Sequence, residues 1–267
     1  MANPTWETST DWDTAQSENQ VMHESINGQR SASNVYLGYP SSSPISPAYT
    51  GYFPLNDPSG SSAVEDMAGS QTLSVEGTTL RDIPGPTGLS APYFDGVDDR
   101  YVNQDVSGTY LDVGGVTELS LCAWIEWDGK NDSTILNYDS TNFRLNINSN
   151  PNLAAVFDDD TGSSFIPFDS AVNDSQWHFV VGTYGPSNAY LYRDATQVDS
   201  VSTNGNALDT ASTMRLEVGA IGETGGQWFE GHIGHCMIFT TQLSATQIQT
   251  LYDVTASGNL LGPKKTL

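Results

Sequence analysis

The chain has 267 residues, of which 32 are acidic and 9 are basic, so its formal net charge at neutral pH is −23. This charge excludes nucleic acid and anionic membranes as favoured partners, because Coulomb repulsion would act over the whole surface. Hydrophobic residues make up 37% and aromatic residues 10% of the chain, enough for the core of one large all-β domain or two small ones.

The acidic residues are spread along the chain, and only three residues are lysine: Lys130, Lys264 and Lys265. Such a surface is typical of a protein from a high-salt cytoplasm or brine, where the Debye length falls to about 3 Å and self-repulsion is screened. An ordinary acidic secreted protein is the alternative. The first residues lack the basic and apolar regions of a signal peptide, and no apolar run has the length of a membrane span.

Residues 1–47 are predicted to form an N-terminal arm and linker. They are polar, contain few aliphatic side chains and end in SSSPISP (41–47), where proline favours extended backbone. A short helix beginning after Thr10 and a disordered arm both agree with this composition. Trp6 and Trp12 are large apolar side chains without a core of their own, so we expect them to pack on the domain, a neighbouring copy or another protein.

From Tyr49 onward the chain is predicted to consist of short strands separated by turns. The central strand is LSLCAWIEW (119–127), whose side chains alternate between two faces. One face carries Leu119, Leu121, Ala123, Ile125 and Trp127; the other carries Ser120, Cys122, Trp124 and Glu126. A second stretch, WHFVVGTY (177–184), is apolar on both faces, so both strands should lie deep in a two-layer body with Trp124, Trp177 and Phe179 buried.

The remaining stretches complete an all-β pattern with one helix. Strands are expected in STILNYD, NFRLNIN, NLAAVFD, SSFIPF, MRLEVGAIG and WFEGHIGHCMIF, and a hairpin in AYLYRDATQVDSV (189–201). Short strands without interleaved helices indicate an antiparallel sandwich or barrel. A helix is predicted over 244–252, with Ser244 and Gln247 as a capping box and Leu243 stapled onto Ile248. Cys122 and Cys236 lie in apolar strands, which allows either two buried free thiols or a bridge.

These stretches together resemble the laminin-G-like, concanavalin-A-like jelly roll, and in particular its pentraxin-type branch. The resemblance covers about residues 49–252 and rests on the order GYFPLND, YFDGVDDRYV, LSLCAWI, WHFVVGTY, AYLYRD, LEVGA, FEGHIGHCMIF and LSATQIQTLY. It implies a two-sheet jelly roll over 48–256, flanked by the arm (1–47) and a C-terminal tail (257–267).

Three positions depart from the family pattern. Asp194-Ala195 stands where relatives have Asp-Gly in the hairpin, which predicts a wider turn. His235 occupies a position that is acidic in many relatives. The resemblance also implies a calcium site, but here only Asp139, Asn142 and Glu223 remain as ligands, fewer than the six to eight oxygens that Ca²⁺ takes. We therefore expect no required cofactor, with Ca²⁺ as an open alternative.

Candidate catalytic groups are sparse. Glu126 with Asp128, and Asp158 with Asp160, have the spacing of paired glycosidase carboxylates, but both pairs adjoin turn or loop sequence. His232 and His235 should face opposite sides of their strand, and His178 is expected to be a satisfied packing residue. We therefore predict that the protein is not an enzyme and has no catalytic residues. Candidate ligand-binding aromatics are Tyr138, Phe165 and Trp228, with Trp127 as a further possibility.

Three functions agree with these observations. The first is a non-enzymatic virion surface protein, of turret, spike, decoration or tail-fibre type, that presents a lectin-like sandwich for assembly or host attachment. Its expected partners are itself, as a trimer or pentamer, other surface proteins through Trp6 and Trp12 of the arm, and host glycans. The second is a free carbohydrate-binding lectin at a cell surface or in the medium. The third is a glycoside hydrolase of the same superfamily.

Overall fold

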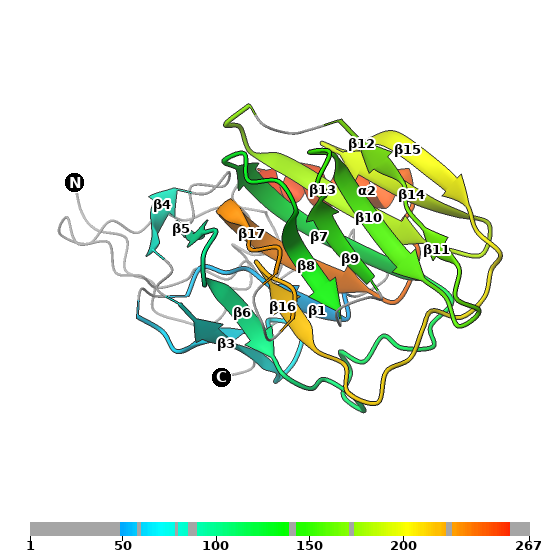
Figure 1. The fold of residues 1–267 in the computed structure, drawn as a ribbon, viewed down its shortest axis with the longest axis horizontal. Helices are drawn as coiled ribbons and strands as arrows, with labels where there is room; N and C mark the ends of the chain where they lie inside the picture. The colour runs from blue at the N-terminus through cyan, green and yellow to red at the C-terminus, as the bar shows by residue number, and fades with distance from the viewer. Residues whose placement is uncertain are drawn as a thin grey trace, which may run out of the picture.

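The structure is a computed structural model, and it describes residues 49–57, 60–77, 80–84, 90–138, 143–170, 174–222 and 226–256. The predicted arm with Trp6 and Trp12, and the predicted tail, lie outside these residues. Within them, two antiparallel sheets pack face to face and one helix covers the outer side of one sheet (Figure 1). The predicted two-sheet sandwich with one short C-terminal helix is confirmed.

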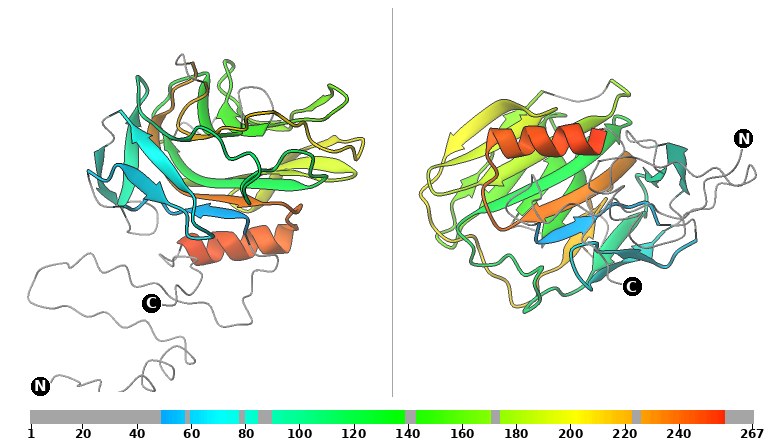
Figure 2. Two further views of the ribbon diagram at one scale, coloured as in Figure 1. Left: turned by 90° about the horizontal axis from the view of Figure 1, so that it is seen from below. Right: turned by 180° about the vertical axis from the view of Figure 1, so that it is seen from behind.

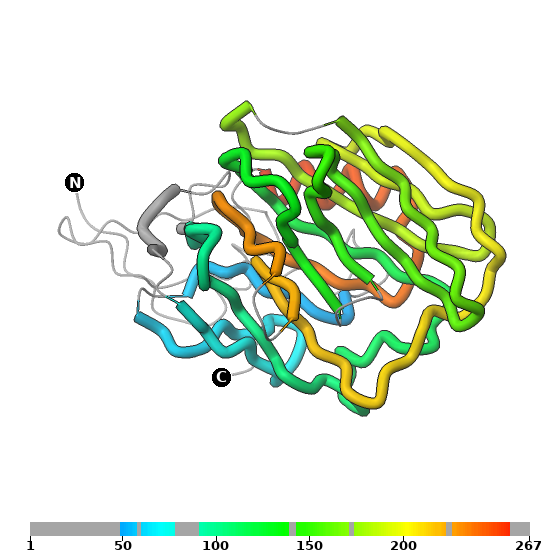
Figure 3. The backbone as a smooth tube through the Cα atoms, viewed as in Figure 1, coloured from blue at the N-terminus to red at the C-terminus, as the bar shows by residue number. Residues whose placement is uncertain are grey.

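The sheet under the helix, which we call the helix-covered sheet, has eight strands. They are β1 (Gly51–Phe53), β4 (Leu80–Pro84), β5 (Ser90–Asp95), β7 (Leu119–Trp127), β13 (His178–Tyr184), β14 (Asn188–Arg193), β15 (Thr196–Ser202) and β17 (Glu230–Phe239). Their spatial order is β15-β14-β13-β7-β17-β5-β4, and β1 pairs with β17. In Figure 3 the blue β1 lies beside the orange β17, so the two ends of the domain close on each other.

The other sheet, which we call the open sheet, has nine strands. They are β2 (Ala63–Glu65), β3 (Thr72–Glu76), β6 (Arg100–Asn103), β8 (Ser133–Tyr138), β9 (Phe143–Ile147), β10 (Leu153–Asp158), β11 (Ser164–Phe165), β12 (Phe168–Asp169) and β16 (Leu216–Val218). Their order is β11-β10-β9-β8-β16-β6-β3-β2, with β12 also paired to β10. Figure 2 shows that no described helix covers its outer side.

The central strand β7 lies between β13 and β17, as its sequence predicts. Its side chains from Leu119 to Trp127 at alternate positions enter the main core between the sheets. Cys122 and Trp124, on the opposite face, belong to a second cluster beneath the helix. Phe179 is fully buried as predicted, whereas Trp177 is only half-buried at the margin of this second cluster, so that part of the core prediction is wrong.

The helix α2 (Ala245–Ala256) begins at the predicted capping box. The Ser244 amide donates to Gln247 Oε1 (2.8 Å), and the Gln247 amide faces Ser244 Oγ (3.4 Å). Leu243 and Ile248 are both buried in the second cluster, in agreement with the predicted staple. The helix continues four residues beyond the predicted end. Across the described part of the chain, no helix has the length and apolar character needed to cross a membrane.

The hairpin between β14 and β15 corrects one sequence prediction. Arg193 pairs with Thr196, so the turn contains only Asp194 and Ala195 and is not wider. Both residues have positive φ (51° and 60°), the conformation of a type I′ turn, which normally favours Asn-Gly or Asp-Gly. Two hydrogen bonds hold this turn against β13: the Asp194 amide donates to the Phe179 carbonyl (2.8 Å), and Asp194 Oδ1 accepts from the Phe179 amide (3.0 Å).

A β-bulge in β17 corrects a second prediction. The pairing of β17 with β7 shifts between Gly234 and Met237, which resets the alternation of side chains. His235, with φ of 51°, stacks on Tyr52 of the second cluster and bonds its hydroxyl (2.9 Å), and His232 lies against Trp177 of that cluster. The two histidines therefore share the helix side of the sheet instead of facing opposite sides.

The two cysteines are free thiols. Cys122 belongs to the cluster beneath the helix, whereas Cys236 faces the main core, so the two side chains lie on opposite faces of the sheet. Burial raises the pKa of both thiols, which keeps them protonated and unreactive. Of the two alternatives that the sequence left open, the structure supports free cysteines.

Candidate functional site

The structure places the predicted ligand-binding aromatics unevenly. Tyr138 and Trp127 are fully buried in the main core and Phe165 lies in the same core, so none of the three offers a surface to a ligand. Trp228 is half-buried just before β17, and the Arg100 guanidinium lies 6.0 Å from its ring centroid. Of the predicted site residues that the structure describes, only Trp228 remains near solvent. The predicted calcium ligands Asp139, Asn142 and Glu223 lie outside the described residues.

The outer face of the open sheet carries a buried ion pair between Arg100 of β6 and Glu217 of β16. Arg100 Nη1 lies 3.2 Å from Glu217 Oε1, and Arg100 Nη2 lies 2.6 Å from Glu76 Oε2 at the margin. Glu217 Oε2 also accepts from the Gly222 amide and from Asn137 Nδ2, both at 3.0 Å. Both carboxylate oxygens of Glu217 are hydrogen-bonded and its side chain is only 1% exposed, so Glu217 has a structural role and does not act as an acid or base on a substrate.

A row of polar side chains extends from this pair across the sheet. Glu217 lies opposite Asn137 on β8, and Asn137 lies opposite Arg144 on β9. Because Asn137 Nδ2 donates to a carboxylate, which can only accept, the amide orientation is fixed and Oδ1 is the free atom. Asn137 is fully buried, yet within the described residues neither its Oδ1 nor Arg144 Nε has a hydrogen-bond partner.

A second row runs parallel to the first. Thr134 of β8 lies opposite Asn146 of β9, Asn146 opposite Ala154 of β10, and Ala154 opposite Phe168 of β12. Asn146 is buried, and no described residue bonds its Oδ1. Phe168, at the edge of the sheet, is 56% exposed. We call Asn137, Arg144, Asn146 and Phe168 the outer polar face.

The outer polar face combines hydrogen-bonding atoms that have no described partner with the exposed ring of Phe168. An uncompensated buried polar atom costs about 1–3 kcal/mol, so each free atom favours a ligand or water that completes it. Amide oxygens accept from hydroxyl groups, a guanidinium donates in a planar fork, and a phenyl ring packs on the apolar face of a sugar. These groups are of the kinds that pair with hydroxyl groups and with the apolar face of a sugar ring.

The sequence did not single out these residues, although a signal was present. In FRLNI (143–147), Arg144 and Asn146 alternate with Phe143, Leu145 and Ile147, the pattern of a strand with one polar face. The alternation does not show which polar residues share one face with Asn137 and Phe168. That depends on the pairing between β8, β9, β10 and β12.

Neither predicted carboxylate pair forms a catalytic arrangement. Glu126 lies opposite His232 on the outer side of the helix-covered sheet, and Asp128 is exposed beyond the strand end. Asp158 accepts from Ser164 Oγ (2.6 Å), and burial raises its pKa, while Asp160 is exposed. The intervening Asp159 is the buried carboxylate, and it holds two loops together through Thr161, Ser163, Asn204 and Asn206.

The histidines also have structural surroundings. His178 Nδ1 lies 2.7 Å from Asp194 and its Nε2 lies 3.1 Å from Asp174, so the predicted satisfied role agrees with the contacts. Burial lowers the pKa of His232, and it lowers the pKa of His235 to about 4. Both rings are therefore neutral near pH 7, packed against Tyr93 and Tyr52 respectively.

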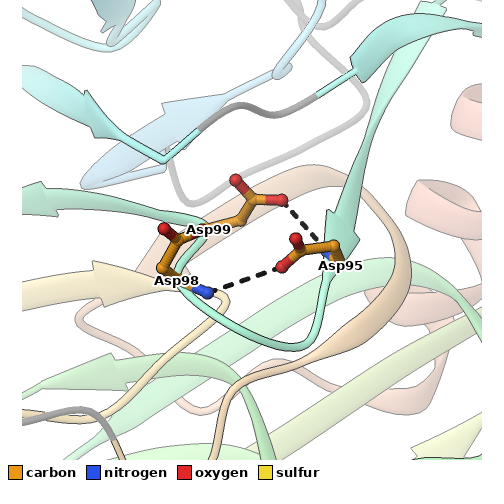
Figure 4. Close-up of side chains that lie close together, drawn as sticks. All are labelled: Asp95, Asp98 and Asp99. Carbon is orange, nitrogen blue, oxygen red and sulfur yellow. Dashed lines mark hydrogen bonds between the residues drawn. The ribbon is translucent and has the colours of Figure 1, made fainter.

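A cluster of three carboxylates lies at the turn between β5 and β6. Asp95, Asp98 and Asp99 have carboxylate oxygens within 4.8 Å of one another (Figure 4). Asp95 Oδ1 accepts from the amides of Val97 (2.8 Å) and Asp98 (3.4 Å), and Asp99 Oδ2 accepts from the Asp95 amide (3.0 Å). These carboxylates thus shape the turn that carries the chain from β5 in one sheet to β6 in the other.

A separate hollow lies beside β2, between the segment that follows β1 and the start of β3. Its described lining includes Asn56, Asp57, Ser61, Ser62 and Glu65. No aromatic side chain is among these described lining residues, so the hollow lacks the ring that a sugar site requires. The outer polar face is therefore the stronger candidate.

Comparison with known sequences decides the family. Residues 99–249, more than half of the chain, match the concanavalin A-like lectin/glucanases superfamily. The chain belongs to this superfamily. No curated protein matches the sequence. The matched segment of this concanavalin A-like chain includes β8, β9, β10, β12 and β16, and therefore the whole outer polar face.

Solved structures show the same concanavalin A-like fold. The receptor binding domain of botulinum neurotoxin C/D mosaic serotype has a TM-score of 0.60 and 16% identity over 81% of this chain and 55% of its own. The binding domain of Paraclostridial Mosquitocidal Protein 1 has a TM-score of 0.61 and 14% identity over 78% and 55%. The ligand binding domain of botulinum neurotoxin serotype D, in complex with N-acetylneuraminic acid, has a TM-score of 0.59 and 15% identity over 80% and 54%. This chain spans about half the length of these structures.

Proposed function

We propose that the sandwich is a non-enzymatic glycan-recognition module and that the outer polar face is its binding site. The observation that carries this proposal is the set of three buried polar atoms without a described partner: Asn137 Oδ1, Arg144 Nε and Asn146 Oδ1. They occupy neighbouring positions on β8 and β9. Because all three atoms are buried, a ligand that completes them must displace the side chains that cover them. Sugar hydroxyls suit this role because each can donate to an amide oxygen and accept from a guanidinium.

Phe168 supplies the apolar component of the proposed site. It lies two strands from Asn146, which at the usual strand spacing is about 10 Å, a span that accommodates more than one sugar ring. A phenyl ring that is 56% exposed has apolar area to bury on binding. Trp228, beside Arg100, is proposed as a second contact at the opposite margin.

Binding is favoured over hydrolysis on chemical grounds. A glycosidase needs two carboxylates on either side of the scissile bond, one of them able to hold a proton near neutral pH. Glu217, which accepts from the Asn137 side chain, is instead held by Arg100, Asn137 and the Gly222 amide. Glycoside hydrolysis is the alternative function, and it requires release of reducing sugar from a glycan.

The names of the similar structures support an attachment role. They are receptor-binding, binding and ligand-binding domains, and one of them holds N-acetylneuraminic acid. We extend the proposal to a homo-oligomeric surface protein of a virion, with residues 1–47 as the docking arm, Trp6 and Trp12 as its anchors and glycans of the host as the ligand. A high-salt habitat and a site for Ca²⁺ at Asp139, Asn142 and Glu223 remain further proposals, and a free lectin is the alternative to the virion role.

A glycan array and a reducing-sugar assay, carried out on the same preparation, test the central part. The proposal expects selective retention of one class of glycan and no release of reducing sugar. Sugar release would favour the hydrolase, and an array without any bound glycan would remove the binding proposal.

Deletion of residues 1–40 tests the assembly part separately. The truncated protein should remain folded, become monomeric and no longer join the particle. A native mass that is unchanged by this deletion, or full-length protein that is already monomeric, would contradict the arm's role.

A further inference from the structure

Arg144 occupies the middle of the outer polar face. It lies on β9 between Asn137 of β8 and Val156 of β10, at directly opposed register positions. Its neighbours in the strand, Phe143 and Leu145, are buried in the main core, so the alternation of β9 places Arg144 on the outer side. The side chain is half-buried, which means that its guanidinium has lost part of its hydration.

Among the described residues, the Arg144 guanidinium lacks the carboxylate partner that Arg100 and Arg193 have. Arg100 pairs with Glu76 and Glu217, and Arg193 pairs with Asp169 at 3.0 Å. Among the described residues, no carboxylate lies within ion-pair distance of Arg144, and its Nε has no hydrogen-bond partner. Within the described part of this acidic chain, Arg144 is therefore a half-buried arginine without a carboxylate contact.

Electrostatics agree with this geometry. Burial lowers the pKa of Arg144, and Asp158 and Asp132 oppose that shift through space without touching it. The guanidinium nevertheless stays protonated, because no protein environment deprotonates arginine at ordinary pH. A charged, partly desolvated fork is stabilised most by a carboxylate that approaches in its plane and accepts two parallel hydrogen bonds.

We infer that the ligand of the outer polar face is an acidic sugar and that Arg144 anchors its carboxylate. The inference rests on the proposed glycan-binding function and names its substrate class: a sialic or uronic acid, whose ring carries a carboxylate next to hydroxyl groups. Asn137 Oδ1 and Asn146 Oδ1 would accept from those hydroxyls. The same two oxygens repel a carboxylate placed near them, so the acidic group is directed to Arg144.

The net charge of −23 does not oppose this assignment at short range. Repulsion between distant charges is screened over about 3 Å in molar salt, whereas a partly buried contact pair is screened much less. Binding of an acidic sugar should therefore persist in about 1 M salt.

Titration of the full-length protein in molar salt tests the inference. The acidic probes are sialyllactose and digalacturonate, and each is paired with its methyl ester, which removes only the charge, and with its neutral counterpart. The protein should bind at least one acidic probe on the order of 10- to 100-fold more tightly than that probe's ester. Arg144→Gln should abolish the preference, and Arg144→Lys should restore part of it, because lysine keeps the charge but not the fork.

Arg193→Gln is the matched control, since it removes the same charge from an arginine that is already paired. It should leave the preference unchanged, and thermal melting should show that all variants are folded. If esters and acids bind equally, or if Arg144→Gln keeps the preference, the acidic-sugar inference is wrong while glycan binding stands. If the wild-type protein binds no glycan, both the proposed function and the inference are wrong.

Discussion

Trp124 and Thr255, 131 positions apart, are joined by a buried hydrogen bond in which the indole Nε1 donates to the threonine Oγ1 at 2.8 Å. Thr255 Oγ1 in turn donates to the Leu251 carbonyl (2.6 Å), and Tyr252 lies over the Trp124 ring with centroids 5.4 Å apart. The last turn of α2 is thus fixed on the central strand β7. Leu119–Trp127 accordingly organises both the inner core and the packing of the helix.

Thr255→Val should lower the free energy of unfolding by about 1–3 kcal/mol, because it leaves the buried indole N–H without an acceptor. Thr250→Val is the matched control, since Thr250 Oγ1 bonds only the Thr246 carbonyl within the helix. Chemical denaturation of both variants gives the difference. Equal losses in the two variants would mean that the bond between Trp124 and Thr255 contributes nothing specific.

The buried ion pair should be asymmetric. Arg100→Leu should cost about 3–5 kcal/mol, because it leaves the buried Glu217 carboxylate without a counter-charge. Glu217→Gln should cost less, about 1–3 kcal/mol, because Arg100 keeps Glu76 as its partner. Urea titration ranks the two variants, and the reverse order would show that Glu217 does not depend on Arg100.

Ala195→Gly should raise the free energy of unfolding by about 1 kcal/mol, since φ of 60° strains an L-alanine but not a glycine. Ala211→Gly is the control in a loop residue without positive φ, and it should not stabilise the protein. A thermal melting point that falls in Ala195→Gly would contradict the type I′ geometry of the hairpin.

His178 should make stability dependent on pH. The hydrogen bond to Asp194 raises its pKa, burial opposes the shift, and Asp174 reinforces it. Because the folded pKa lies above the unfolded value of about 6.5, the stabilisation is complete below that pH and is lost as pH rises through the folded pKa. The gap in unfolding free energy between wild type and His178→Gln should therefore be wider at about pH 5.5 than at about pH 9. An unchanged gap would show that the imidazolium has no role.

The fold was more predictable from sequence than the site, and the reason is physical. Alternation fixes which residues of LSLCAWIEW face the core, and the capping box at Ser244 and Gln247 fixes where the helix begins. The bulge at His235 adds one residue to a strand, which no local pattern announces, and it reversed the predicted side of a histidine. Tyr138 and Phe165 adjoin loop sequence, which predicts exposed aromatics, but burial depends on strands paired from elsewhere.

Glycan binding by the outer polar face is tested by titrating one glycan from the array against two variants that each shorten one exposed side chain. Phe168→Ala and Val97→Ala each shorten an exposed apolar side chain (56% and 66% exposed), but only Phe168 belongs to the outer polar face. Phe168→Ala should weaken binding about tenfold or more, through loss of ring burial, while Val97→Ala should bind like the wild type. Equal affinity of Phe168→Ala and wild type for that glycan would contradict binding at the outer polar face.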